Sequence, residues 1–343
     1  MLRVLVAEDS PTARRLLVSL LRADPEIEVV GEACDGAEAV ELCKKLRPDL
    51  VTMDIDMPVM DGVEATRRIM VEAATAVVMV SSLEPADVKR SMNALDAGAL
   101  AVLAKPGGPN TPRFDRERTE LLATIEAMAK VKLVRRWPAV PPYRSATATS
   151  TGAPGHDVAV IGLVASTGGP NALRIVLTAL PAEFAPPILV VQHIAAGFAN
   201  GLAEWLAATT ARNVKIASHG EPLANSTVYV APDDRHLEAE RHRIVVSDSA
   251  PVEGFRPSGT RLFSSLASVF GSSAIGVILT GMGQDGVSGL RDMRDAGSTV
   301  LAQDEDSCDI FGMPGAAVKA GVVRTTTPLT EISGRLVELV AKR

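Results

Sequence analysis

Three side chains in the C-terminal half of the sequence could together hydrolyse an ester or an amide. Ser166, His193 and Asp285 each stand at, or shortly after, the end of a short apolar run. If those runs are parallel strands, their carboxyl ends meet at one edge of a sheet and the three side chains converge. A serine nucleophile, a histidine base and an orienting aspartate make up a serine hydrolase. Backbone N–H groups after Ser166 could stabilise the oxyanion that such a reaction forms.

Each of these residues also has a simpler interpretation. A serine or an aspartate before a helix is most often its N-cap, and a lone histidine is most often satisfied by local hydrogen bonds. Asp285 could thus cap a helix that begins at Val287. His236, in the motif D-R-H-L, is a rival base, but we expect it in a loop. The remaining histidines are expected to be solvated loop residues: His156, His219 and His242.

The stretch that contains Asp285, LTGMGQDG at 279–286, allows a different function. It holds the pattern G-x-G-x-x-G before a helix-like run, and Asp304 follows where a dinucleotide fingerprint expects a ribose-binding carboxylate. A nucleotide-binding oxidoreductase is therefore one alternative. The pattern follows the fifth apolar run of its half of the chain, however, whereas the fingerprint normally follows the first. A non-catalytic adaptor is a second alternative, and it would not need Ser166 or His193.

A second group of reactive side chains is predicted in the N-terminal half. Glu8, Asp9, Asp54, Ser81 and Lys105 also follow apolar runs. Carboxylates brought together repel one another unless a cation joins them, and an oxygen-rich cluster suits Mg²⁺. With a lysine as a second cation, one carboxylate could attack a phosphoryl group and form an acyl phosphate. A single acid at a strand end more often faces solvent or caps a helix, so this prediction also rests on the whole group.

Alternating apolar runs and amphipathic segments indicate two α/β units that position these residues. The strands predicted for the first unit are 2–7, 27–32, 50–53, 76–80 and 101–104. They predict a flavodoxin-like, five-stranded parallel sheet. The second unit has predicted strands at 158–165, 187–192, 227–231, 243–247, 274–280 and 298–302, and helices at 171–179, 199–208, 259–270 and 287–296. It is expected to be a doubly wound α/β domain with a mostly parallel sheet.

The segment between the two units is predicted to be a linker. Residues 137–155 are rich in Pro, Ala, Ser, Thr and Gly, and they show no helix or strand period. We therefore predict an N-terminal domain at 1–134, a linker at 135–156 and a catalytic domain at 157–343. Two domains also suit a chain of 343 residues.

Composition excludes some classes of function. The net charge of −6 argues against a nucleic-acid partner, because binding of nucleic acid needs clustered Lys and Arg side chains. The three cysteines form no C-x-x-C pair, which suits a reducing compartment. The N-terminus, MLRVLVAEDS, lacks the long apolar core of a signal peptide, and no apolar run is long enough to span a bilayer. We expect a soluble cytoplasmic protein with no direct membrane insertion.

The N-terminal unit resembles the receiver domain of two-component response regulators over nearly its whole length. The matching motifs are E-D after the first strand, M-D-I-D-M-P-V-M-D-G after the third, V-S-S after the fourth and K-P after the fifth. The resemblance implies that Asp54 accepts a phosphoryl group from a histidine kinase and that Glu8 and Asp9, with Asp54, hold Mg²⁺. It also implies that Ser81 and Lys105 sense the phosphoryl group. The sequence departs from many receivers in having a valine, Val102, at the aromatic switch position.

The C-terminal unit resembles the catalytic domain of the chemotaxis protein-glutamate methylesterases (the CheB family). The matching motifs are A-S-T-G-G-P, V-Q-H with G-F, Y-V-A-P-D-D-R-H-L, F-R-P-S, L-T-G-M-G-Q-D-G and A-Q-D-E followed by F-G-M-P-G-A-A. By this resemblance Ser166 is the nucleophile, His193 the general base and Asp285 its orienter, while Thr167 and Met282 help to build the oxyanion and substrate site.

The same resemblance implies the reaction and its regulation. The expected substrates are glutamyl methyl esters of chemoreceptors, together with particular receptor glutamines that would be deamidated, and the ester step needs no cofactor. Phosphorylation of Asp54 is expected to relieve an obstruction by the receiver. The sequence departs from many relatives at Val164, before the nucleophile turn, and at Ala195 and Ala196, where they carry Pro-Pro.

Overall fold

The structure is a computed structural model that describes residues 1–111, 114–131, 158–240 and 242–341. The chain divides into two compact units, Met1–Trp137 and Pro138–Arg343. The whole of the predicted linker, 135–156, lies outside the described residues, so the domain boundaries stay predictions. Each unit is considered below by itself.

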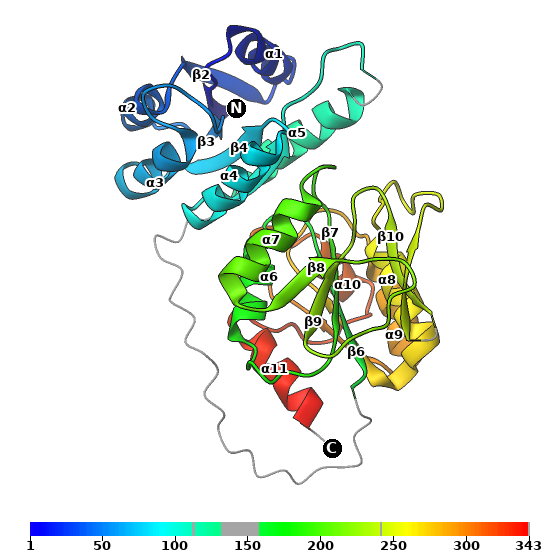
Figure 1. Cartoon of the computed structure of the whole chain (residues 1–343). Coiled ribbons are helices and arrows are strands. Elements are labelled where there is room, and N and C mark those ends of the chain that lie inside the picture. The colour runs from blue at the N-terminus through cyan, green and yellow to red at the C-terminus, as the bar shows by residue number, and fades with distance from the viewer. Residues whose placement is uncertain (112–113, 132–157, 241, 342–343) are drawn as a thin grey trace. The chain divides into compact units, whose positions relative to one another are not determined.

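The first unit is a five-stranded parallel sheet, as predicted (Figure 1). Its strands lie in the order β2-β1-β3-β4-β5. Neighbouring helices α2, α3 and α4 pack against one another in sequence. Its strands are β1 (Leu2–Ala7), β2 (Ile27–Ala33), β3 (Leu50–Met53), β4 (Ala76–Ser81) and β5 (Ala101–Ala104). Its helices are α1 (Pro11–Arg22), α2 (Gly36–Leu46), α3 (Gly62–Glu72), α4 (Pro85–Asp96) and α5 (Phe114–Met128).

Local sequence explains how these elements begin. Ser10 caps α1, because its hydroxyl oxygen accepts the N–H of Ala13, and Pro11 occupies the first turn, where no N–H is needed. Every residue of β3 and of β4 is buried, as expected for central strands covered on both faces. The carboxyl end of β3 therefore delivers Asp54 to the edge of a rigid sheet.

Gly62, the first residue of α3, lies in contact with the backbone of Asp54. A Cβ at Gly62 would stand 1.9 Å from the Asp54 carbonyl oxygen, and backbone atoms cannot move aside cheaply. We expect Gly62→Ala to destabilise the first unit by about 2 kcal/mol or more. Scanning calorimetry of the full chain should show this loss, while Gly108→Ala serves as the matched control because a Cβ there meets nothing within 4 Å. Equal stability of the two variants would contradict the prediction.

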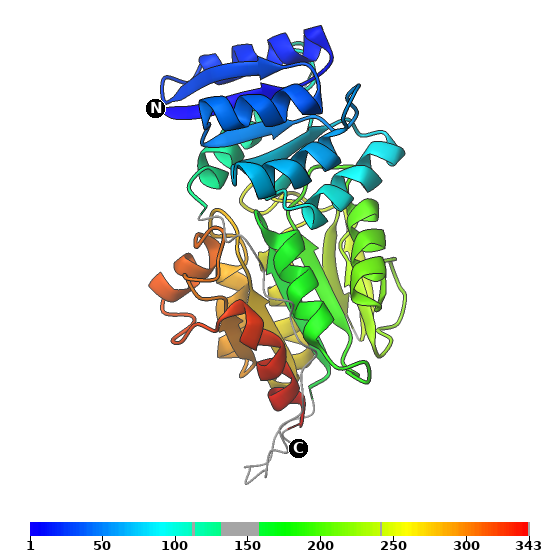
Figure 2. The same ribbon diagram turned by 90° about the vertical axis from the view of Figure 1, so that its left-hand side faces the viewer.

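The second unit has a six-stranded sheet in the order β13-β12-β6-β7-β9-β8, and all of its described strand pairs are parallel (Figure 1). Helix α6 packs against α7 and α11, and α8 packs against α9. Figure 2 shows helices in front of and behind this sheet, so the doubly wound prediction is confirmed. The sheet strands are β6 (Val160–Ala165), β7 (Ile188–Gln192), β8 (Asn213–Ile216), β9 (Thr227–Val230), β12 (Ala274–Ile278) and β13 (Thr299–Ala302). The helices are α6 (Gly169–Ala179), α7 (Ala199–Thr210), α8 (Gly259–Phe270), α9 (Val287–Asp295), α10 (Met313–Lys319) and α11 (Leu329–Ala341).

Several elements differ from the sequence prediction. The run 243–247 forms β11 (Arg243–Ser247), but it pairs antiparallel with β10 (His236–Glu240) in a separate hairpin instead of joining the main series. His236 was expected in a loop and is the first residue of β10, so that expectation was wrong. Strand β8 was missed because its four residues alternate exposed and half-buried positions, which is an edge-strand pattern with little apolar signal. The helices α10 and α11 are also absent from the prediction.

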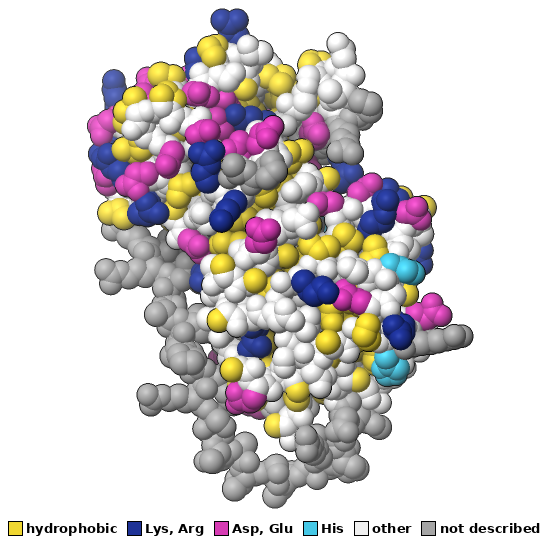
Figure 3. Space-filling model, in the orientation of Figure 1, with side chains coloured by type: hydrophobic (Ala, Val, Ile, Leu, Met, Phe, Trp, Pro, Cys, Tyr) yellow, Lys and Arg dark blue, Asp and Glu magenta, His cyan; other side chains and the backbone are white. Residues whose placement is uncertain are grey.

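The distribution of charged side chains and the apolar length of the helices can be compared with what the composition predicts. On the face shown in Figure 3, Lys and Arg side chains lie interspersed with Asp and Glu over the first unit, without a large basic patch. Within the described residues, no helix combines the length and the apolar character needed to cross a bilayer.

Candidate functional site

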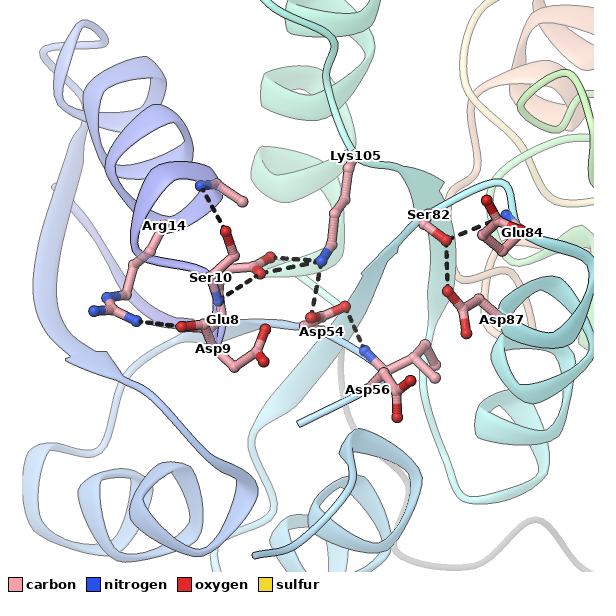
Figure 4. Close-up of polar contacts among 12 residues, drawn as sticks. Glu8, Asp9, Ser10, Arg14, Asp54, Asp56, Ser82, Glu84, Asp87 and Lys105 are labelled. Carbon is pink, nitrogen blue, oxygen red and sulfur yellow. Dashed lines mark hydrogen bonds and ion pairs between the residues drawn. The ribbon is translucent and has the colours of Figure 1, made fainter. Parts of the chain in front are cut away.

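Two carboxylates and one ammonium group meet at the carboxyl edge of the first sheet (Figure 4). Nζ of Lys105 lies 2.8 Å from Oδ2 of Asp54 and 3.0 Å from Oε2 of Glu8. The N–H of Ile55 donates to Oδ1 of Asp54 at 2.7 Å, and the N–H of Ser10 donates to Oε1 of Glu8 at 3.2 Å. Each carboxylate is thus held by a backbone N–H group and by the shared lysine.

This cluster has an excess of acidic groups, because two buried carboxyl groups share one ammonium group. Glu8 and Asp54 are 0% and 4% exposed. Burial, followed by the charge of Asp54, raises the pKa of Glu8 to about 7. Burial also raises the pKa of Asp54, and the hydrogen bond from Lys105 opposes that rise without cancelling it. Burial acts to lower the pKa of Lys105, but its two carboxylate partners outweigh this and raise it. The cluster would therefore gain from a further cation.

The residues fit a divalent cation. Carboxylate oxygens of Glu8, Asp9 and Asp54 lie within 4.8 Å of one another, and oxygen donors suit Mg²⁺. Asp9 is exposed, and it is Ser10 that caps α1, so the Asp9 side chain is not the helix cap. At the end of β4, the hydroxyl of Ser81 is buried and has no hydrogen-bond partner among the described residues. The N–H of Lys105 donates to the carbonyl of Ser81 at 2.8 Å, which places the two residues side by side.

In the second unit, His193 is hydrogen-bonded to Asp285. Nε2 of His193 lies 2.8 Å from Oδ2 of Asp285, which is fully buried. The carboxylate also accepts the N–H of Gly259 at 2.6 Å, the hydroxyl of Ser258 at 2.8 Å and the N–H of Thr260 at 3.1 Å. Asp285 therefore binds the N-terminus of α8, where the helix dipole favours a negative charge.

These hydrogen bonds keep Asp285 ionised. Burial acts to raise the pKa of Asp285, but the hydrogen bond from His193 and those from Gly259 and Ser258 outweigh it and lower the pKa to about 2. A carboxylate can only accept, so Nε2 of His193 carries the proton and Nδ1 is the free acceptor of the neutral ring. Nδ1 is buried and has no hydrogen-bond partner within the described chain. The ring of Phe255 stacks on the imidazole with its centroid 4.3 Å away.

Ser166 leaves β6 beside the point where His193 leaves β7. The register pairs Ala165 with Gln192, and the N–H of His193 donates to the carbonyl of Ala165 at 2.9 Å. The side-chain amide of Gln192 donates to the carbonyl of Ser166 at 2.7 Å and to that of His193 at 2.8 Å. Gln192 therefore ties together the two backbone segments that carry the predicted nucleophile and base.

The glycine-rich stretch 279–286 passes next to this turn. A Cβ at Gly281 would lie 2.6 Å from the Cβ of Ser166, so only glycine permits the close approach. Met282 follows it and is half-buried. No side chain caps α6, which begins after Thr167 and Gly168. Pro170 has no N–H, and the N–H of Gly169 already donates to the carbonyl of Ser166 at 2.8 Å, so Asn171 supplies the remaining N–H of the first three helical positions.

The alternatives for single residues turn out differently. Gly286, and not Asp285, is the N-cap of α9. His236 is fully buried; its Nδ1 accepts the N–H of Ser258 at 3.2 Å and its Nε2 lies 3.2 Å from the carbonyl oxygen of Ala250, so it supports the start of α8 and is not a free base. His219 and His242 are exposed, and His156 lies outside the described residues.

Some functional neighbours were missed from the sequence. The motif F-R-P-S was noted, but nothing in its spacing indicated that Phe255 would stack on His193 or that Ser258 would donate to Asp285. The structure also disfavours the dinucleotide alternative. Asp304, the expected ribose-binding carboxylate, accepts hydrogen bonds from the N–H and the hydroxyl of Ser307 in its own loop.

Comparison with known proteins gives a consistent result. Residues 161–336 match the family model described as CheB methylesterase, and residues 4–112 match the response regulator receiver domain. A protein-glutamate methylesterase/protein-glutamine glutaminase 4 of Myxococcus xanthus is 55% identical, with 98% of this chain and 96% of that protein covered. A protein-glutamate methylesterase/protein-glutamine glutaminase 3 of Anaeromyxobacter dehalogenans is 51% identical, with 98% of both covered. The crystal structure of the Thermotoga maritima CheB methylesterase catalytic domain is 35% identical, with a TM-score of 0.52, and covers 54% of this chain and 100% of that chain.

Proposed function

This chain belongs to the CheB methylesterase family and carries a receiver domain, and we propose on that basis that it is a phosphorylation-regulated protein-glutamate methylesterase. Its proposed substrates are methyl esters of glutamate side chains in the cytoplasmic parts of chemoreceptors, and it would also deamidate particular receptor glutamines. The observation that carries this proposal is the hydrogen bond between His193 and the buried Asp285. His193 directly follows β7, and β7 pairs with β6, the strand that Ser166 follows. Methanol release from a methylated receptor tests it.

The proposed chemistry uses the free nitrogen of His193. Oγ of Ser166 attacks the ester carbonyl while Nδ1 of His193 takes its proton, because Nε2 is bound to Asp285. The tetrahedral intermediate expels methanol, which receives that proton, and an acyl-enzyme remains. Water then attacks the acyl group with His193 again as base, which releases the glutamate side chain and restores Ser166. A glutamine substrate gives the same acyl-enzyme but releases ammonia.

The oxyanion would be stabilised at the start of α6. The N–H of Asn171 in its first turn would supply a hydrogen-bond donor at the positive end of the helix dipole. Thr167 and Met282 are proposed to complete this wall of the site, since both flank Ser166 and are partly exposed. The ester step would need no cofactor.

Asp54 is the proposed phosphoacceptor. Its carboxylate would attack the phosphoryl group carried by a histidine kinase, and the bond from phosphorus to the kinase histidine would break. Glu8, Asp9 and Asp54 would hold Mg²⁺, which neutralises charge on the phosphoryl oxygens. Lys105, already 2.8 Å from Asp54, and the hydroxyl of Ser81, which has no partner among the described residues, would contact those oxygens. Phosphorylation of Asp54 is then proposed to raise the esterase activity of the second unit.

Loss of this carboxylate should abolish stimulation. In the presence of Mg²⁺ and a small phosphoryl donor, we expect methanol release by the parent protein to rise between about 5- and 150-fold, the usual range of such coupling. Asp54→Asn should show no rise, because an amide cannot form the acyl phosphate, and a chelator should remove the rise from the parent. Asp56→Asn is the control, since Asp56 is exposed and pairs with Arg90. Undiminished stimulation of Asp54→Asn would refute the assignment.

A further inference from the structure

Asp309 lies in the segment between β13 and α10, and this segment is fastened to the nucleophile turn. The hydroxyl of Thr280 donates to the carbonyl of Thr167 at 3.1 Å and accepts the N–H of Ile310 at 2.9 Å. The carbonyl of Ile310 in turn accepts the N–H of Gly281 at 3.0 Å. The backbone next to Asp309 is therefore fixed against the residues that follow Ser166.

The carboxyl group of Asp309 rests on Gly168, two residues after Ser166. A Cβ at Gly168 would lie 2.3 Å from Oδ2 and 2.8 Å from Cβ of Asp309, and Gly168 has a φ of +77°. Glycine is required here both by this contact and by the left-handed backbone. Any substrate acyl group that reaches Ser166 is brought to the neighbourhood of this carboxyl group.

The carboxyl group of Asp309 has neither a hydrogen-bond donor nor a cation as a partner among the described residues. Within the described part of the chain it accepts no hydrogen bond and joins no ion pair, and burial raises its pKa to about 6. A half-buried carboxylate without a partner is costly, and such residues are concentrated at functional sites. The triad chemistry described above makes no use of it. The simplest use for an unpaired acceptor beside a nucleophile is to bind a donor on the substrate.

We propose that Asp309 is a specificity-determining residue whose carboxylate accepts a hydrogen bond from the NH₂ group of a substrate carboxamide and so favours glutamine over the glutamyl methyl ester. The inference rests on the proposed function. The carboxamide has two N–H donors, whereas the methoxy group has none and leaves the carboxylate unpaired. A site with an unpaired polar group discriminates against the substrate that fails to pair it. Asp309 exchanges no proton: His193 still supplies the proton with which ammonia leaves.

The test compares two substrates that differ only in the leaving group. Receptor fragments carrying glutamine or glutamyl methyl ester at one site are assayed for ammonia and methanol release, and kcat/KM is measured for each because it reports acylation. Asp309→Ala should lower the ratio of deamidation to ester hydrolysis by at least about tenfold, the lower limit expected for one hydrogen bond to a charged group. Asp306→Ala, an exposed acid in the same segment, should leave the ratio unchanged. A general loss of folded protein lowers both rates and cancels in the ratio.

The outcomes separate this inference from the function on which it rests. If the parent protein releases both products and Asp309→Ala leaves the ratio unchanged, the inference is wrong and the proposed function stands. An equal fall in both kcat/KM values would also overturn it, because Asp309 would then serve binding of the receptor and not the leaving group. Methanol release without any ammonia release by the parent would likewise overturn it. If the parent releases neither product, the proposed function itself fails.

Discussion

Replacement of Ser166 by alanine is expected to lower the rate of methanol release by at least about 10³-fold, because the remaining catalysis comes only from the oxyanion site and substrate binding. The fold should survive this change. The contacts that hold Ser166 in place use its backbone, with its N–H donating to the carbonyl of Thr280 at 3.0 Å and its carbonyl accepting from Gln192 at 2.7 Å. Alanine keeps both. Steady-state methanol release from a methylated receptor fragment measures the loss.

The control for this experiment is Ser218→Ala, which removes an exposed hydroxyl from a loop of the same unit. It should retain the parent rate, and circular dichroism should show that both variants are folded. Full activity in Ser166→Ala would rule out the serine mechanism. It would also revive the adaptor alternative, in which the three residues have no catalytic role.

Asp285→Asn is expected to reduce kcat by about 10⁴-fold, the effect of the same change in a serine protease triad. The NH₂ group of asparagine must replace one carboxylate oxygen. If it replaces Oδ2, it faces the N–H of Gly259 and donates to Nε2 of His193, which forces the imidazole proton onto Nδ1. If it replaces Oδ1, it faces the N–H of Thr260. In either arrangement an NH₂ group faces an N–H donor, so at least one hydrogen bond to residue 285 is lost. The first arrangement also leaves Ser166 without a base.

The variant should also change the dependence of stability on pH. The pKa of Asp285 is lowered to about 2 in the folded protein, so the ionised carboxylate stabilises the fold above about pH 4, and this contribution is lost as the pH falls toward 2. Asp285→Asn lacks this pH-dependent contribution, so its stability should fall less than that of the parent as the pH is lowered from about 4 toward 2. Asp292→Asn, an exposed acid on α9, is the control. A kcat for Asp285→Asn within about tenfold of the parent value would contradict the role assigned to the carboxylate.

Much of the fold follows from the sequence because apolar runs of a parallel sheet are long and continuous. The five-stranded sheet, five of the six strands of the second parallel sheet, and the positions of Asp54, His193 and Ser166 at strand ends could be predicted in this way. Within each of the two sheets, the parallel strands bring their carboxyl ends to one edge, which is why residues far apart in the same unit could be grouped from the sequence. Their catalytic and phosphoacceptor roles stay proposals.

What the sequence could not predict depends on contacts between distant segments. Asp285 stands two residues before α9, so local rules favour it as a cap for that helix. Its carboxylate instead binds the start of α8, more than twenty residues earlier in the chain. The same limit applies to His236, whose hairpin and hydrogen bond to Ser258 arise from tertiary packing. The contact between Asp309 and Gly168 joins segments that no local pattern connects.

The most direct test of the central claim is to trap the acyl-enzyme. The parent protein is mixed with a methylated receptor fragment, the reaction is quenched with acid during turnover, and the protein is digested and analysed by mass spectrometry. We expect the receptor glutamyl group to be attached to the peptide that contains Ser166, and to be absent when Ser166→Ala is treated in the same way. An acyl group on a different residue, or methanol release at the parent rate from Ser166→Ala, would contradict the account.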